Sequence, residues 1–315
     1  MQSYEEMIHI VVLKQFQQVP LDIHRIPIGI SNEVYNVKLK DQEVIIRLST
    51  ETKFLRGSSK HIPELNKLDI HVPQILAQDY SKKLIPLAYQ IQTKILGLDL
   101  GLVIEKLTKE QLKKLAHEVV AIFNKIKTIT PIDNKYGLVW GQDENDLSDS
   151  WTERMNLWID ESIARGQSTG IINDTITQQL KDIYRVYKPY FDSVKPVTYF
   201  GDISSKNVMI SDGKLSGLVD LDGLTQGDPL EAIGRIKIAW YGTSYGTFYT
   251  NAVMDEMQLD KDQRKIVTLY ALLNQASLLC ENGILFNQNT CTAIDRSQEK
   301  RDKEIINMLV AELRL

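Results

Sequence analysis

A loop between two strand-like runs constrains this chain more than any other feature, because polar residues stand in it at a fixed spacing. Residues 196–200 and 208–210 are short apolar runs, and Asp202 and Asn207 stand between them, five positions apart. Runs of this length and composition predict strands. The chain must therefore fold so that one carboxylate and one amide share a short loop between two strands.

Two more carboxylates follow where a hairpin ends. Asp212-Gly213 is a strong turn signal, and the β-rich run at residues 215–221 leads to Asp220 and Asp222. Phosphoryl transfer uses a carboxylate to orient the acceptor hydroxyl and a nearby amide oxygen to hold Mg²⁺, and kinases supply both with an Asp-x4-Asn spacing. Carboxylates are hard oxygen ligands that suit Mg²⁺. Each motif alone is typical of a turn or a helix cap, but together they predict the catalytic loop and metal ligands of a kinase.

The first third of the chain has the pattern of a small antiparallel sheet. Apolar runs separated by turn residues predict two hairpin-linked strands within residues 25–49, and β-rich segments follow at residues 75–79 and 84–93. Between them, residues 53–69 have a helical pattern interrupted by one glycine and one proline. We therefore expect a sheet-based lobe over residues 1–95.

From residue 97 onward the apolar period is that of helices. Thr108 with Gln111, and Ser150 with Glu153, have the spacing of capping boxes and predict two helix starts. Further helices are predicted at residues 174–190, 266–273 and 306–313, and a polar loop at residues 131–149. The predicted class is thus α+β, with a mainly helical lobe over residues 96–315.

Composition narrows the classes of protein that remain. A chain of 315 residues is long enough for about two domains, and its net charge of −4 lacks the basic excess of a nucleic-acid binder. Cys280 and Cys291 are too few for a disulfide framework and lack zinc-ligand spacing. No apolar run approaches the ~20 residues that span a bilayer, and Glu5 and Glu6 precede the first short apolar run, unlike an export signal. We expect a cytoplasmic protein without a nucleic-acid, membrane or protein partner.

The order of these motifs resembles the aminoglycoside phosphotransferase and choline kinase superfamily, small-molecule kinases with a bilobal, protein-kinase-like fold. The resemblance covers roughly residues 20 to 240. It rests on seven segments: residues 29–37, Ile45-Ile46-Arg47-Leu48, His71-Val72-Pro73, Leu96-Gly97-Leu98-Asp99-Leu100, Gly201-Asp202 with Asn207, Val219-Asp220-Leu221-Asp222, and Gly227-Asp228-Pro229.

The resemblance implies a role for each candidate site residue. It makes Asp202 the catalytic carboxylate and Asn207 and Asp220 the ligands of Mg²⁺, with Asp222 helping to bind a second ion. It implies that ATP or GTP is the phosphate donor. The residues that would bind this nucleotide are Gly29, Ser31, Asn32, Val34, Arg47, Gln92, Lys94 and Ile95.

Several positions depart from the pattern of this superfamily. Phe200 stands where a histidine is usual, Ser204 and Lys206 stand where histidine and glycine are frequent, and Arg47 replaces the usual phosphate-binding lysine. An arginine can grip phosphate through two bonds, so this exchange preserves the chemistry. The segment after Arg47 lacks a glutamate at the spacing expected for an ion pair with this cation, and Glu51 and Glu64 are the nearest candidates.

We therefore expect a kinase that transfers the γ-phosphate of ATP or GTP to a hydroxyl of a small molecule. The first choice of acceptor is an aminoglycoside, macrolide or similar antibiotic, so that the enzyme would confer resistance, with acidic positions such as Glu231 and Glu281 as candidates for binding a cationic substrate. A metabolic kinase for choline, homoserine or a thiosugar is the alternative, followed by a nucleotide-binding pseudokinase. A metal-dependent hydrolase using Asp220 and Asp222 is the remaining rival, although all five histidines lie in the first half of the chain.

Overall fold

The computed structural model describes residues 2–26, 32–141, 145–284 and 293–314. The chain divides into two compact units. The first unit contains residues 1–96 together with two later segments, 140–145 and 217–223, and the second contains the remainder. The later segments matter for the site, because one of them carries Asp220 and Asp222.

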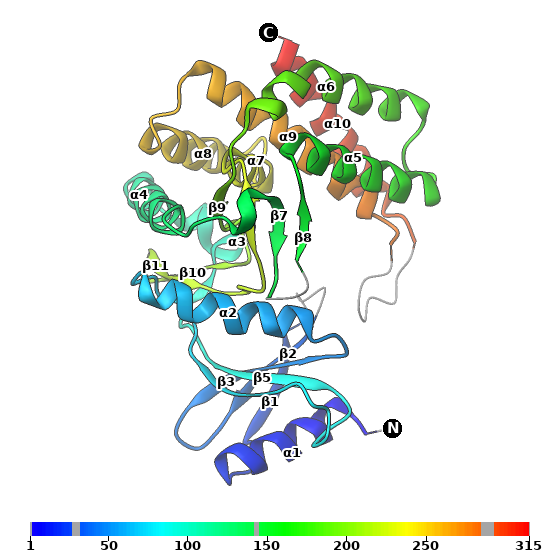
Figure 1. Ribbon diagram of the computed structural model, residues 1–315. Coiled ribbons are helices and arrows are strands. Elements are labelled where there is room, and N and C mark those ends of the chain that lie inside the picture. Colours follow the sequence, from blue (N-terminus) through cyan, green and yellow to red (C-terminus); the bar gives the residue numbers. More distant parts are fainter. Residues whose placement is uncertain (1, 27–31, 142–144, 285–292, 315) are drawn as a thin grey trace. The chain divides into compact units, whose positions relative to one another are not determined.

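A five-stranded antiparallel sheet forms the centre of the first unit, in the order β1-β2-β3-β5-β4 (Figure 1). Two helices, α1 and α2, lie on opposite faces of it. The bounds of these elements are α1 Tyr4–Phe16, β1 Asp22–Ile26, β2 Glu33–Lys38, β3 Glu43–Ser49, α2 Lys53–Lys67, β4 Ile75–Asp79 and β5 Ala88–Thr93. The predicted hairpin strands are confirmed, and so is the helix at residues 53–69.

The alternation of side chains along β3 divides the sheet into an apolar and a polar face. Ile46 and Leu48 point toward the buried residues of α1, whereas Arg47, between them, bonds to α2 on the other face. Helix α1 was not predicted. Its apolar run begins after a capping box of Ser3 and Glu6, and that run packs into the sheet core.

Gly57 lies inside α2 without interrupting it. A Cβ atom at this position would lie 1.7 Å from the carbonyl oxygen of Asp222 and 2.5 Å from that of Trp140. The glycine is therefore needed for a close backbone approach within the first unit, and its cost in helix propensity, about 1 kcal/mol relative to alanine, is offset by tertiary contacts.

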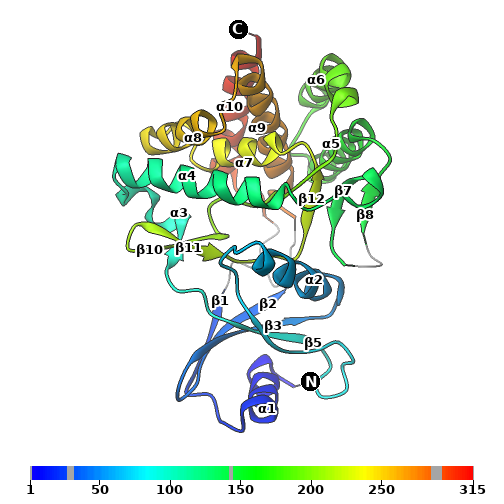
Figure 2. The ribbon, with the colours of Figure 1, turned by 60° about the vertical axis from the view of Figure 1, so that its left-hand side comes forward.

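The second unit is mainly helical and is built around α9, against which α7, α10 and α5 pack (Figure 2). It contains a sheet in the order β8-β7-β12-β9, and β6 and β10 form a small sheet with β11. Its helices are α3 Leu100–Val103, α4 Lys109–Ile126, α5 Trp151–Ser168, α6 Asp174–Ser193, α7 Leu230–Ala239, α8 Ser244–Glu256, α9 Lys261–Glu281 and α10 Arg296–Arg314. The strands are β6 Leu98–Asp99, β7 Tyr136–Val139, β8 Asp146–Ser148, β9 Val197–Tyr199, β10 Val208–Ser211, β11 Lys214–Leu218 and β12 Leu224–Gly227, and the last two residues of β11 belong to the first unit.

The α+β class, with an antiparallel sheet first and helices after it, is confirmed. The polar loop predicted at residues 131–149 is wrong, because this stretch contains β7 and β8, which pair with each other. Ser150 does cap α5 through the Glu153 amide, but the Glu153 carboxylate accepts a hydrogen bond from the Asp149 amide, so the predicted reciprocal box does not close. In the described part of the chain, no helix is long and apolar enough to cross a membrane.

Candidate active site

The loop between β9 and β10 holds Asp202 and Asn207 against each other. The Asn207 Nδ2 atom donates to the backbone oxygen of Asp202 at 3.0 Å and to its Oδ2 atom at 2.7 Å. Both partners are acceptors, so the amide can have only one orientation here. Its nitrogen binds Asp202, and its oxygen remains as a neutral ligand for a cation. Asn207 is buried, whereas Asp202 is partly exposed.

Arg235, on α7, lies beside this loop and was not predicted from the sequence. Its Nη1 atom is 3.9 Å from the Asp202 Oδ1 atom, and its Nε atom donates to Glu231 at 2.8 Å. Desolvation would lower the pKa of Arg235, but the carboxylates of Glu231 and Asp202 raise it above its ordinary value. A permanent positive charge therefore stands near the proposed base. The i,i+4 spacing of Glu231 and Arg235 was the available sequence signal.

Glu231 is an internal anchor of that arginine. Its carboxylate is buried and accepts hydrogen bonds from the Tyr199 hydroxyl at 3.2 Å and the Asn274 amide at 3.2 Å. A carboxylate so committed to protein donors is not available to a substrate. The structure therefore does not support Glu231 as a binder of a cationic acceptor.

The Gly-Asp-Pro motif anchors the start of α7. Asp228 is buried and accepts hydrogen bonds from the Leu230 amide at 3.1 Å, from the Tyr270 hydroxyl at 2.9 Å and from the Tyr190 hydroxyl. Burial raises the pKa of Asp228. This network fixes the helix that carries Arg235, so Asp228 supports the site without belonging to it.

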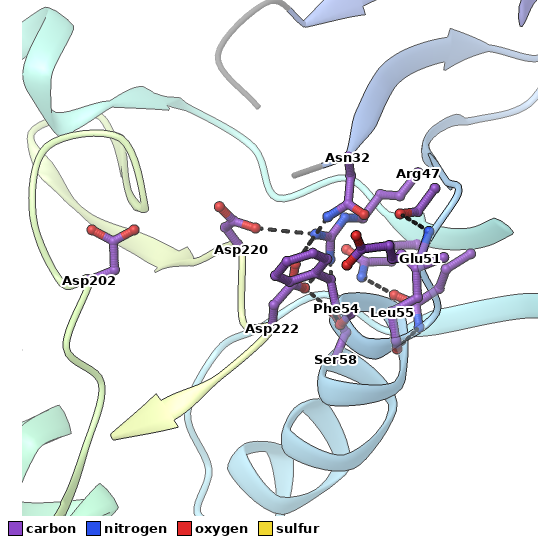
Figure 3. A network of polar contacts seen from close by, with 12 residues as sticks. Asn32, Arg47, Glu51, Phe54, Leu55, Ser58, Asp202, Asp220 and Asp222 are labelled. Carbon is purple, nitrogen blue, oxygen red and sulfur yellow. Dashed lines mark hydrogen bonds and ion pairs between the residues drawn. The ribbon is translucent and has the colours of Figure 1, made fainter. Parts of the chain in front are cut away.

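Arg47 is the centre of a second polar cluster, in the first unit (Figure 3). It is 4% exposed. Its Nη1 and Nη2 atoms each lie 2.6 Å from an oxygen of Asp222, which gives a two-pronged ion pair. The Nη2 atom also donates to Asp220 at 3.2 Å. Burial alone would lower the pKa of Arg47, but the two carboxylates raise it above its ordinary value.

The two carboxylates of this cluster have different surroundings. Both oxygens of Asp222 accept two hydrogen bonds, from Arg47 and from the side chains of Ser58 and Asn32. The side chain of Asp220 is 42% exposed, and its backbone is left-handed, at φ 58°. Such a conformation costs about 1–3 kcal/mol in a non-glycine residue and clusters at functional sites.

The missing glutamate of α2 is explained by this cluster. Glu64 pairs with His61 at 3.3 Å, and no ion pair between Arg47 and either Glu51 or Glu64 occurs among the described residues. Ser58, on the same helix, contacts Arg47 at 2.8 Å. A serine carries no sequence signal for this role, which is why it was not predicted.

The remaining candidates for nucleotide binding lie on or next to strands of the first sheet. Val34 is the cross-strand neighbour of Arg47, Ile95 is buried, and Gln92 donates to Gln90 at 2.5 Å. Lys94 pairs with Glu43 at 2.5 Å. The predictions for Gly29 and Ser31 lie outside the described residues.

The available donors suit Mg²⁺. The described residues contain no group of three histidine, cysteine or acidic side chains that could hold a metal ion. Mg²⁺ does not require such a cage, because it is commonly held by one or two carboxylates together with water and substrate phosphates. The exposed carboxylate of Asp220, in the first unit, and the oriented oxygen of Asn207, in the second, are each a hard oxygen donor of the type that Mg²⁺ prefers.

Comparison with known proteins places these features in a family. Residues 22–253 match the model of the phosphotransferase enzyme family, whereas no curated protein sequence matches the chain. The structure is similar to a thermostable mutant of aminoglycoside phosphotransferase APH(4)-Ia (TM-score 0.74, 13% identity, 98% of each chain covered). It is also similar to aminoglycoside 2'-phosphotransferase-IIIa in its GDP complex (TM-score 0.72, 14% identity, 98% of this chain and 99% of that chain covered).

A third structure, the streptomycin-ATP-APH(2")-IIa ternary complex, has a TM-score of 0.66 at 12% identity and covers 98% of this chain and 97% of its own. At these identities the solved structures establish the fold, which confirms the kinase-like architecture. The family model spans most of the sequence, from β1 to α8. The chain therefore belongs to the phosphotransferase enzyme family, as the order of its Asp202, Asp220 and Asp228 motifs predicted.

Proposed function

We propose that the protein is a small-molecule kinase that transfers the γ-phosphate of ATP or GTP to a hydroxyl group. The observation that carries this proposal is the pairing of Asn207 with Asp202, in which one side chain orients the other. Residues 1–95 are proposed as the nucleotide-binding lobe and residues 96–315 as the catalytic and acceptor-binding lobe. The complexes of similar proteins with GDP and with ATP support a nucleotide donor.

In the proposed reaction, Asp202 accepts a hydrogen bond from the acceptor hydroxyl and then takes its proton. The acceptor oxygen forms a bond to the γ-phosphorus while the bond from that phosphorus to the bridging oxygen breaks, and the diphosphate leaves. Arg47 would exchange its longest contact, the 3.2 Å bond to Asp220, for a phosphate oxygen, and Asp220 and Asn207 would hold Mg²⁺. When bound, the ion neutralises charge on the phosphates. The sequence motifs that contain Asp220 and Asn207 support the proposal that both residues bind one ion.

For the acceptor, we propose an antibiotic with a free hydroxyl, so that the reaction would confer resistance. The supporting observation is that similar structures are aminoglycoside phosphotransferases, one of them bound to streptomycin. We place this activity in the cytoplasm, where nucleoside triphosphates are available.

A metabolic kinase is the second candidate, and one observation favours it. The guanidinium of Arg235 lies near Asp202, Glu231 is committed to protein donors, and Glu281 lies 3.6 Å from Arg165. A polycationic acceptor would meet a positive charge beside the proposed base and two carboxylates that already have partners. An acceptor with little positive charge, such as a sugar or an amino acid, suits these surroundings better.

A phosphate-transfer screen tests the proposal. Purified protein is incubated with Mg²⁺ and either ATP or GTP, across a panel of aminoglycosides, macrolides, choline, homoserine and thiosugars, and nucleoside diphosphate release is measured. Release above the background without acceptor, lost in Asp202→Ala, is the expected result and identifies the acceptor class. Nucleotide binding without transfer to any acceptor would favour the pseudokinase, and absence of binding would overturn the kinase assignment.

A further inference from the structure

Arg47 is a buried cation, and a buried charge must be paired. In this chain the pairing carboxylate does not come from α2, the helix that follows the strand of Arg47. It comes from Asp222, 175 positions further along the chain. The two-pronged geometry, with both N–O distances at 2.6 Å, matches the planar fork of a guanidinium to a carboxylate.

Ser58 completes this pair from α2. Its hydroxyl accepts a hydrogen bond from Arg47 at 2.8 Å and donates to the Oδ1 atom of Asp222. One small side chain therefore contacts the cation and its counter-ion together. Ser58 is fully buried and Asp222 is 7% exposed, so solvent does not compete for these contacts.

The backbone of α2 is adapted to the same contact. Gly57 precedes Ser58 and lies against the backbone of residue 222, where a side chain would collide with the Asp222 carbonyl. This close approach brings the helix near enough for a serine, rather than a longer side chain, to reach the ion pair. Gly57 and Ser58 are both poorer helix formers than alanine, and the contact of α2 with Asp222 explains why both occur here.

Asp222 has little capacity left for a metal ion. A carboxylate offers about four lone-pair sites, and four are used here: two by Arg47, one by Ser58 and one by Asn32, whose Nδ2 atom donates at 3.1 Å. Asp220 differs, because its side chain is 42% exposed and its contact with Arg47 is longer, at 3.2 Å. Since the Nη hydrogens of Arg47 are all in use, this longer contact is the one that a phosphate would replace.

We propose that Asp222 and Ser58 are positioning residues that hold the Arg47 guanidinium for nucleotide phosphate, in place of a glutamate from α2, and that Asp222 is not a metal ligand. This inference rests on the proposed function, because it assigns Arg47 to the phosphates of a nucleotide. It predicts that loss of either residue weakens nucleotide binding without changing the response to Mg²⁺.

The first experiment measures MgATP and MgGTP binding by calorimetry, over a range of Mg²⁺ concentrations, for the wild type and for Asp222→Asn and Ser58→Ala. Asp222→Asn is expected to weaken binding about tenfold to hundredfold, as for one partner of a buried ion pair, and Ser58→Ala about threefold to tenfold. The Mg²⁺ concentration for half-maximal binding stays unchanged in both. Ser59→Ala, on the same helix and bonded to Gln78 rather than to Arg47, is the matched control and retains wild-type affinity.

Three results would contradict this inference or the proposed function on which it rests. Rescue of Asp222→Asn by high Mg²⁺ would make Asp222 a metal ligand and overturn the inference. Wild-type affinity in both variants would also overturn it while leaving the proposed function intact. Failure of the wild type to bind either nucleotide would instead overturn the proposed function, and this inference with it.

A second variant keeps the proposal testable if Asp222→Asn does not fold. Exchanging the two side chains, as Ser58→Glu with Asp222→Ser, moves the carboxylate onto α2. If the carboxylate acts by holding Arg47, the double variant binds nucleotide more tightly than Asp222→Ser alone. Equal or weaker binding by a folded double variant would contradict the positioning role.

Discussion

The Asp202 loop and the Arg47 cluster carry the two halves of the proposed chemistry, and they are built in opposite ways. The loop joins residues five positions apart and leaves Asp202 partly exposed. The cluster joins Asn32, Arg47, Ser58 and Asp222, which come from four separate segments, and all of them are buried. A reacting group can thus be positioned by residues near it in the sequence, whereas a buried cation needs partners from several distant segments. Substitutions in the loop should therefore act on turnover, and substitutions in the cluster on stability and binding.

The largest effect is expected at the loop. Asp202→Ala should reduce turnover by ~10²-fold or more, because general-base contributions are of this order, while nucleotide affinity stays nearly unchanged. Initial-rate kinetics and calorimetry on the same preparation measure both quantities. Asp182→Ala, which removes an exposed carboxylate of α6, is the control. Unchanged turnover would remove Asp202 from the mechanism.

The second-largest effect is expected in the Arg47 cluster, and it concerns the stability of the fold rather than turnover. Arg47→Met leaves Asp222 buried without its cation and should lower the free energy of unfolding by about 3–5 kcal/mol. Asp202→Asn keeps a side-chain oxygen to accept the Asn207 hydrogen bond at a partly exposed position, so it should change this free energy by no more than about 1 kcal/mol. Urea denaturation of the three proteins tests this. A loss below about 1 kcal/mol in Arg47→Met would mean that the pair does not hold the first unit together.

Gly57→Ala should lower the free energy of unfolding by less than Arg47→Met does, whereas a glycine-to-alanine substitution inside a helix normally raises it. An alanine in a helix interior normally stabilises by about 1 kcal/mol relative to glycine. Here the added methyl group would collide with the backbone of residue 222, so we expect a loss of about 1–3 kcal/mol, as for other overpacked sites. Asn66→Ala, at an exposed position of the same helix, is the control and should be neutral or slightly stabilising. A more stable Gly57→Ala variant would show that the close approach does not constrain α2.

The smallest effect concerns the ion pair of His61 with Glu64 within α2, in which Glu64 is partly exposed. The hydrogen bond from His61 lowers the pKa of Glu64. A depressed carboxylate pKa stabilises the fold above the ordinary glutamate pKa of about 4.3, and this contribution is lost as the pH falls through the lower folded value. Glu64→Gln should thus be less stable than the wild type by about 0.5 kcal/mol at pH 6, and the difference should be smaller at about pH 3. Thermal unfolding at both pH values measures it, and a difference that grows in acid would contradict the sign.

Several parts of the protein were predictable because their signals are local. The Thr108 and Gln111 capping box begins α4 as predicted, and the hairpin of β2 and β3 follows from alternating apolar residues. The same holds for the Asp202 loop, because the spacing predicted that Asp202 and Asn207 share a short loop between two strands, and they lie between β9 and β10. In each case the interacting groups belong to one helix turn, one loop or one hairpin, so the local course of the backbone brings them together.

Other features have no local signal. Helices α7 and α8 were not predicted as separate elements, and β7, β8 and β12 are strands of only three or four residues. Such short strands form because they pair with each other in one sheet, and isolated strand pairs are marginal in water. The sequence of a single strand does not say which partner it will find.

The sequence by itself determined the family, the α+β class and the positions of Asp202, Asn207 and Asp220, because these rest on residue type and spacing. Only the tertiary structure decided that Arg47 pairs with Asp222 rather than with Glu51 or Glu64, that Ser58 joins them, and that Arg235 lies beside Asp202. The physical reason is the penalty of a buried charge. It requires that a counter-ion be present but does not specify where along the chain that residue stands, so folding selects the carboxylate that the backbone brings close enough.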